Sequence, residues 1–104
     1  MNNWFLYLIR CRNGRLYTGI TTDVERRFEE HRNGEKKGSK YLRGKAPLKL
    51  VMKKKVGNRS MALKIEAKVK KLPKIKKELL VDDKIKIREI KKKITATAIN
   101  TKAN

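Results

Sequence analysis

The sequence has little of what commonly holds small extracellular proteins together. It contains one cysteine, Cys11, which excludes an intrachain disulfide and a zinc site built from several cysteines. It also has no long hydrophobic run. The most apolar stretch, residues 4–11, is too short for a signal peptide or a membrane span. We therefore expect a cytoplasmic protein with neither disulfides nor a membrane span.

Acidic residues are also scarce. Ten of them stand beside 30 lysines and arginines, so the formal net charge is +20. Nearly all of the excess lies after residue 34. Such a field attracts polyanions, so nucleic acid is the first partner to consider and an anionic membrane surface the second. The ordinary alternative is that most of these lysines are simply solvated.

Apolar residues make up only 38% of the sequence. A chain of this length suits one domain, and its apolar residues thin out toward the C-terminus. We therefore expect residues 1–81 to form the domain and residues 82–104 to be a basic accessory tail. Within this tail, residues 84–94 fit either a strand or a basic helix, and the small polar residues that follow are expected to fray.

The first third of the chain predicts a β-hairpin. Residues 4–11 suit a buried strand, and the Asn13-Gly14 pair that follows is a strong signal of a two-residue turn. Residues 15–20 then form the returning strand. This turn would place Arg10 opposite Tyr17 and leaves the distance between Tyr17 and Tyr7 open.

A helix is expected from about Asp23, whose side chain can cap it, to about Asn33-Gly34. On a helical wheel, Val24 and Phe28 define the buried stripe. Arg27 and His31 fall on the edge of the same stripe, whereas Glu25, Arg26, Glu29 and Glu30 point toward water. A charge that faces the protein body needs a partner, water or a ligand. This helix therefore gives the first indication of a site.

The second half predicts a third strand over residues 47–56 and two helices. The first helix, residues 61–72, is capped by Asn58 or Ser60 and stopped by Pro73. Its Glu66 borders the apolar stripe. The second helix covers residues 74–81. We therefore predict an α/β fold with a small, mainly antiparallel three-stranded sheet flanked by helices.

The order and spacing of Tyr7, Tyr17, Arg27, His31 and Glu66 resemble the GIY-YIG endonuclease superfamily, in particular its small stand-alone bacterial members. The first signature triplet stands here as residues 5–7, Phe-Leu-Tyr, and the second as residues 17–19, Tyr-Thr-Gly. The resemblance continues to about residue 81. Its departures are Phe-Leu in place of Gly-Ile and Thr in place of Ile.

The resemblance implies a nuclease that hydrolyses a phosphodiester bond with one divalent metal ion, Mg²⁺ or Mn²⁺. Glu66 is the implied metal ligand, and Arg27 can hold a phosphate oxygen through its forked donors. Tyr7 or Tyr17 would orient or deprotonate the attacking water, and His31 would relay the proton or bond to a tyrosine. Which tyrosine is the base does not follow from the sequence.

Each of these residues also has an ordinary structural interpretation. Tyr7 suits core packing, Arg27 could pair with Glu30, and His31 could interact with the helix dipole. Glu66 and Lys70 form a common i,i+4 pair. The functional interpretation is favoured jointly, because five such coincidences in the order of one family are less probable than one site.

A polar, glycine-punctuated segment over residues 35–45 is expected to form a loop. Its basic side chains could track phosphates, and its single aromatic residue could stack on a base. The candidate nucleic-acid-binding residues are Lys36, Lys37, Lys40, Tyr41, Arg43 and Lys45.

We therefore expect a metal-dependent endonuclease, acting as a monomer on structured or single-stranded DNA in repair or DNA processing, with RNA as a further possibility. The first alternative is a nucleic-acid-binding protein without catalysis that uses the same basic surface. The second is a module whose tail docks on another protein or on an anionic membrane.

Overall fold

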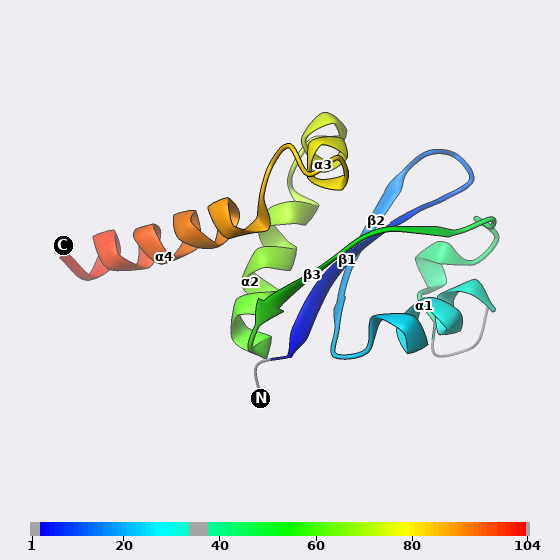
Figure 1. Cartoon of the computed structure of the whole chain (residues 1–104), viewed down its shortest axis with the longest axis horizontal. Coiled ribbons are helices and arrows are strands. Elements are labelled where there is room, and N and C mark those ends of the chain that lie inside the picture. Colours follow the sequence, from blue (N-terminus) through cyan, green and yellow to red (C-terminus); the bar gives the residue numbers. More distant parts are fainter. Residues whose placement is uncertain (1–2, 34–37, 104) are drawn as a thin grey trace.

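The computed structural model describes residues 3–33 and 38–103, with side chains as far as residue 96. In the described residues, three strands and three helices follow one another in the order that the sequence predicts, and the segment left open between strand and helix forms a fourth helix (Figure 1). These elements, with one short 3-10 turn (η1), are β1 (Trp4–Arg10), β2 (Leu16–Thr21), α1 (Val24–Arg32), η1 (Lys40–Leu42), β3 (Lys49–Gly57), α2 (Arg59–Lys70), α3 (Lys74–Val81) and α4 (Ile87–Ala103).

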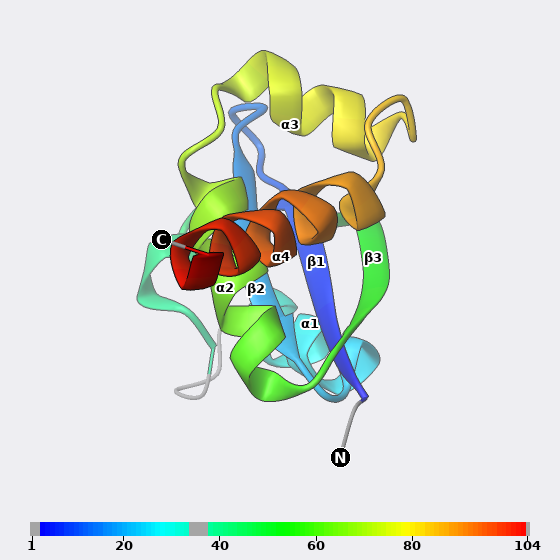
Figure 2. The same cartoon turned by 90° about the vertical axis from the view of Figure 1, so that its left-hand side faces the viewer.

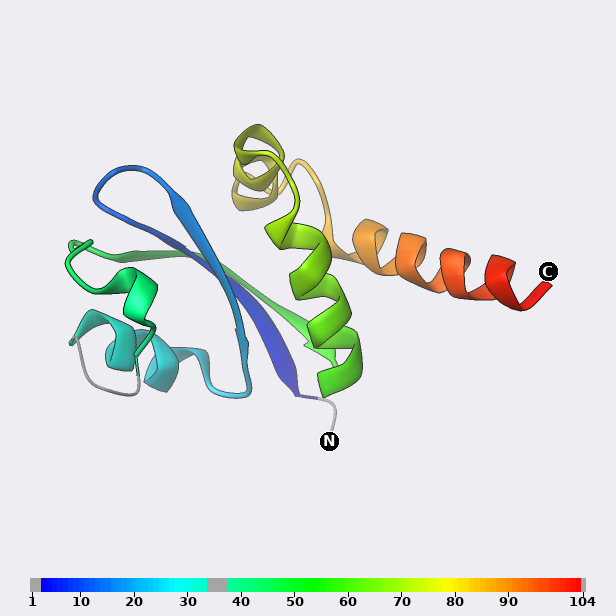
Figure 3. The ribbon, with the colours of Figure 1, turned by 180° about the vertical axis from the view of Figure 1, so that it is seen from behind.

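The strands form one antiparallel sheet in the order β2-β1-β3. The most apolar segment of the sequence is thus the central strand, which is covered on both faces. The helix α1 lies on one side of the sheet and α2 on the other (Figure 3). The predicted α/β fold with a three-stranded antiparallel sheet is confirmed.

Two apolar clusters follow from the alternation of side chains along β1. Leu6 and Leu8 point toward α2 and pack with Ala62, Ile65 and Val69, all fully buried. This cluster is the larger and extends onto α3 and α4.

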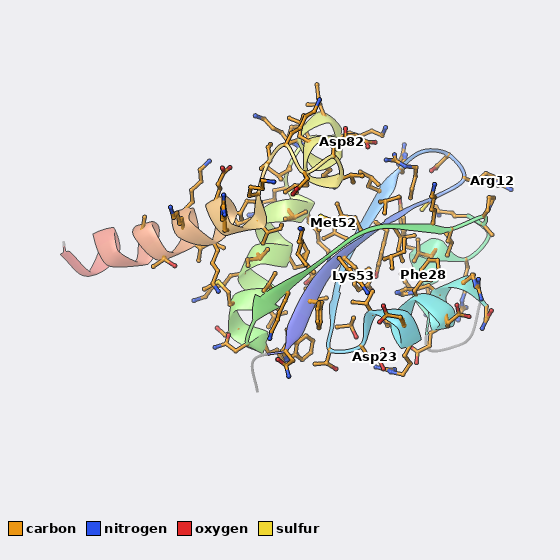
Figure 4. The ribbon with its side chains drawn as sticks, in the orientation of Figure 1. Arg12, Asp23, Phe28, Met52, Lys53 and Asp82 are labelled. Carbon is orange, nitrogen blue, oxygen red and sulfur yellow. The ribbon has the colours of Figure 1, made fainter. Side chains whose placement is uncertain are left out.

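The other face of β1 carries Tyr7 and Ile9, which pack with Val24 of α1 and Leu42 of η1. Phe28 lies between α1 and the sheet and completes this smaller cluster (Figure 4). Because Tyr7 belongs to this cluster, its polar end is held by a rigid apolar frame.

The hairpin between β1 and β2 differs from the prediction by one residue. Arg10 pairs with Leu16, and not with Tyr17. The amide of Gly14 donates to the carbonyl of Cys11, and Gly14 has a φ of 84°, so the loop has three residues instead of two. A type I turn followed by a left-handed glycine is the usual form of such a loop. The predicted two-residue turn is therefore wrong.

The helix caps are local and follow the sequence. The Asp23 side chain accepts from the amide of Arg26 at 3.1 Å, and the Asn58 side chain accepts from the amide of Met61 at 2.9 Å. The helix α1 has its C-cap at Asn33, whereas Gly34 lies outside the described residues. One prediction for α1 is wrong: Glu30 is buried instead of facing water.

The basic segment after α3 becomes a helix whose first turn is part of the core. Ile87 is 8% exposed and joins the larger cluster, and Ile90 and Ile94 pack against it. The rest of α4 projects away from the body, on the side opposite to α1 (Figures 1 and 2). Among the described residues no helix has the length and apolar character needed to cross a membrane.

Replacing Ile87 with alanine tests how far residues 82–104 belong to the fold. We expect Ile87→Ala to lower the free energy of unfolding by about 2–4 kcal/mol, because it leaves a cavity in the larger cluster. The measurement is urea denaturation at an unchanged m value. The control is Ile75→Ala on α3, where the side chain is 69% exposed and we expect a change within about 0.5 kcal/mol. Equal, small effects would mean that the tail is only accessory.

Candidate active site

The site is built around a hydrogen bond between β1 and α1. The Tyr7 hydroxyl lies 2.9 Å from Nε2 of His31, and both residues are buried. The other ring nitrogen, Nδ1, accepts a hydrogen bond from the amide of Ser39 at 3.0 Å. One imidazole therefore connects the strand, the helix and the loop over residues 38–45.

These contacts define the protonation of His31. Because Nδ1 accepts from an amide, the ring proton of the neutral imidazole is on Nε2, which then donates to the Tyr7 oxygen. Burial, together with the positive charge of Arg27, lowers the pKa of His31 from 6.5 to about 4. His31 is thus neutral near pH 7.

Tyr7 is 2% exposed, and its phenol is held in the protonated form. Burial raises its pKa well above the ordinary value, and the neighbouring Tyr17 adds to this shift. Arg27 opposes the shift through its charge and a hydrogen bond. The ring lies directly over Gly19, where a Cβ would overlap with the phenol oxygen. Glycine at this position therefore makes room for the tyrosine.

Tyr17 joins Tyr7 because of the observed register. Tyr7 pairs with Gly19 and Ile9 pairs with Tyr17, so the two tyrosines are diagonal neighbours on one face. Their ring centroids lie 6.3 Å apart, and the Tyr17 ring lies 5.5 Å from that of His31, edge to face. Under the predicted two-residue turn, Tyr17 would have pointed to the opposite face.

Arg27 extends from α1 toward the two tyrosines, and an ion pair with Glu30 holds its side chain in position. Its guanidinium donates to Glu30 at 3.0 Å, and Arg26 donates to the other oxygen of Glu30 at 2.7 Å. The bond from Arg27 lowers the pKa of Glu30, which stays ionised. Glu30 was not among the predicted site residues, although its i,i+3 and i,i+4 spacing to the two arginines is a signal of this kind.

Glu66 stands on α2, which packs against β2 and β1 from the opposite face. Its side chain is 19% exposed and lies 3.5 Å from Lys70, the ordinary pair expected from the spacing. Its negative charge nevertheless contributes to raising the pKa of Tyr7. A carboxylate on α2 thus lies within electrostatic range of the phenol, although α2 packs on the opposite face of the sheet.

The donor set for a metal ion is small. Across residues 3–33 and 38–103 there is no group of three or more His, Cys, Asp or Glu side chains placed to hold a metal. Glu66 is a hard oxygen ligand, and Mg²⁺ usually keeps several waters and binds through one or two carboxylates plus substrate phosphates. The residues therefore fit an ion whose remaining ligands are water and phosphate.

The loop after α1 adds one more aromatic ring, on the solvent side, to the cluster formed by the rings of Tyr7, Tyr17 and His31. Tyr41 is 43% exposed and stacks on Tyr17 with centroids 5.9 Å apart. The ammonium of Lys45 lies 4.3 Å above the Tyr41 ring. Lys40 and Arg43 are exposed beside it. The predicted binding residues Lys36 and Lys37 lie outside the described residues.

A hollow of about 270 Å³ opens beside this cluster and passes the edge of β2. Tyr17 and Tyr41 line one side, and Lys70 and Lys77 line the other. Thr18 also faces this hollow. Its hydroxyl is buried and has no hydrogen-bond partner in the described part of the chain. Sequence reasoning missed Lys70 and Lys77 because they belong to helices far along the chain.

A family model described as the GIY-YIG catalytic domain matches residues 3–78. The chain belongs to the GIY-YIG family. Proteins of this family are generally endonucleases, so membership implies a nucleic acid substrate. The match ends at residue 78, before α4 begins.

Within the GIY-YIG family the chain is similar to bacterial UPF0213 proteins. It is 58% identical over 81 residues to UPF0213 protein YhbQ of Escherichia coli O127:H6, covering 78% of this chain and 79% of that protein. The same identity and length relate it to a UPF0213 protein of Cronobacter sakazakii, with 83% of that protein covered. The solution NMR structure of UPF0213 protein BH0048 from Bacillus halodurans is 43% identical, covers 79% of this chain and 84% of that one, and has a TM-score of 0.50.

The buried histidine of this GIY-YIG domain gives its stability a pH dependence. The unfolded chain takes up a proton with a pKa of 6.5 and the folded one only at about 4. Stability is therefore fully present above pH 6.5 and is lost as the pH falls toward 4, by about 3 kcal/mol. Denaturation of the wild type and His31→Gln at several pH values measures this. Carboxylates contribute equally to the pH dependence of both proteins. If the free energy of unfolding falls with the same slope against pH in the variant, the assignment of this pH dependence to His31 is contradicted.

Proposed function

We propose that this protein is a divalent-metal-dependent endonuclease that hydrolyses phosphodiester bonds in structured or single-stranded DNA, in repair or DNA processing. The observation that carries the proposal is the convergence of Tyr7, Tyr17, Arg27 and His31 on one face of the sheet, beside a hollow lined by basic residues. Family membership independently supports the reaction class.

The positions of the residues suggest separate roles for the two tyrosines. Tyr7 is buried, keeps its proton and is bonded to His31, so it suits positioning of Tyr17 and the imidazole. Tyr17 is half-buried and lines the hollow, where a water molecule and a phosphate can reach it. We therefore assign to Tyr17 the contact with the attacking water.

Arg27 suits the phosphate. Glu30 fixes its guanidinium, and a planar guanidinium suits a non-bridging phosphate oxygen as negative charge develops there. Glu66 would hold the metal ion, which when bound supplies further positive charge for the phosphate oxygens. The exposed ring of Tyr41 offers a surface for stacking an unpaired base.

A cleavage panel of single-stranded, flapped, branched and duplex DNA and RNA, with Mg²⁺ or Mn²⁺, tests this function. We expect cutting of structured or single-stranded DNA. Arg27→Ala should lower the single-turnover rate roughly 100-fold or more, because a preorganised donor to the developing charge is lost. The Glu66→Gln variant should need a higher metal-ion concentration than the wild type to reach the same rate. The matched control is Glu89→Gln, an exposed carboxylate on α4.

Retained folding, measured by circular dichroism, is required for every variant. Salt-dependent binding without metal-dependent cutting of any substrate would overturn catalysis and favour a nucleic-acid-binding protein. If both Arg27→Ala and Glu66→Gln cut at the wild-type rate, the assignment of the site is wrong. The activity would then come from a contaminant or from another site.

The two tyrosines are separated by conservative variants. We expect Tyr17→Phe to lower the single-turnover rate roughly 100-fold or more at unchanged stability, since a positioned acid–base group is worth about that much. Tyr7→Phe leaves the buried Nε2–H of His31 without its acceptor and should cost about 1–3 kcal/mol of stability, with a smaller effect on rate. Urea denaturation and rate measurements on both proteins check this, and the reverse pattern would exchange their roles.

A further inference from the structure

A second basic hollow lies far from the tyrosine cluster, between β3, α4 and the turn that joins α3 to α4. Its volume is about 450 Å³. Five cations line it, and Asp83 is the one carboxylate among the described residues that do so. The cations are Lys54, Lys55, Lys86, Arg88 and Lys91.

The charges in this hollow are not balanced internally. Asp83 lies 2.7 Å from Lys86 and 3.9 Å from Lys54, so the two lysines already share the only carboxylate. The hydrogen bond and charge of Lys86 lower the pKa of this carboxylate, and the charges of Lys54 and Arg88 add to the shift. Lys55 and Lys91 bring further positive charge, and like charges held together repel unless an anion joins them.

Two features of the fold bring these cations close to one another. Lys54 stands on β3 two residues after Met52 and two before Val56, which both belong to the larger apolar cluster. Because every second side chain of a strand shares a face, Lys54 occupies a position on the core-facing side. From the other side, the Lys91 ammonium reaches back to the end of β3, where it would lie 3.7 Å from a Cβ at Gly57. Lysines on an edge strand commonly prevent sheet extension, but this does not account for Arg88 and Lys91 on α4.

The packing of α4 against the core fixes the positions of Arg88 and Lys91. Ile87 and Ile90 fix one face of α4 in the larger apolar cluster, which directs Arg88 and Lys91 toward the hollow. In Figure 2 the first turns of α4 begin beside β3 and pass in front of the sheet. The side opposite to α1 therefore carries a preformed cationic surface that continues along α4, through Lys92.

We propose that this hollow binds the phosphate backbone of a duplex arm of nucleic acid, as a second contact outside the catalytic site. Clustered lysines and arginines on one face are the footprint of sequence-independent backbone binding. A membrane fits less well. Interfacial helices insert large apolar side chains, whereas the described isoleucines of α4, Ile87, Ile90 and Ile94, pack in or against the core. The exposed large apolar residues of the described chain are Tyr41, Leu63 and Ile75, and none of them lines the hollow.

The test compares two triple variants with the same loss of charge. The first is Lys55→Gln, Arg88→Gln and Lys91→Gln. The control is Lys49→Gln, Lys68→Gln and Lys76→Gln, three exposed lysines outside the hollow. Binding to a labelled DNA duplex of about 20 base pairs is measured by fluorescence anisotropy over a series of salt concentrations. Each phosphate contact contributes about 0.9 to the slope of log K against log salt.

We expect the first triple variant to lose at least tenfold in duplex affinity, with a slope lower by about 2–3, and the control to lose less than threefold. Equal losses would overturn the proposal in favour of net charge alone. Loss of binding to anionic phosphatidylserine vesicles with unchanged duplex affinity would overturn it in favour of a membrane surface. Duplex binding is measured without a metal ion and therefore without cleavage, so failure of this contact and failure of catalysis are distinguished.

Discussion

The pairing of Tyr7 with Gly19 is the constraint on which the rest of the site depends. It lets the phenol ring lie flat against the backbone of β2 and brings its oxygen to His31 of α1. The same register turns Tyr17 onto this face. A slip of one residue would send Tyr17 into the opposite cluster, because side chains alternate along a strand. The site is therefore a consequence of strand register as much as of residue identity.

His31 and Glu30 of α1 are buried, and the structure gives both of them partners. His31 uses both ring nitrogens, and Arg26 and Arg27 divide the two oxygens of Glu30 between them. Such connected groups hold one arrangement, since an unmade bond in a buried place is costly. Preorganised donors are also what a developing negative charge on a phosphate requires. Structural and chemical demands on α1 thus coincide.

The positive charge is arranged on two distant sides of the molecule. One part borders the tyrosine cluster, from Tyr41 to Lys77. The other surrounds the hollow between β3 and α4 and depends on Ile87, which anchors the helix in the core. The family match ends at residue 78, so Lys54 and Lys55 of this second surface lie inside the matched catalytic domain, whereas Lys86, Arg88 and Lys91 lie outside it. A nucleic acid with more than one arm could contact both.

Local patterns in the sequence are enough to predict the elements as far as α3 and the family. Asp23 and Asn58 cap their helices, α3 spans the predicted residues 74–81, and the spaced motifs indicate the correct family, because caps, breakers and periodicity are local signals. Tertiary structure alone decided the hairpin register, the burial of Glu30 and the approach of Glu66 to Tyr7. Asn-Gly permits more than one turn, and only the packing of a face against its partners selects among them. Contacts between residues tens of positions apart, such as those around α4, leave no periodic trace in the chain.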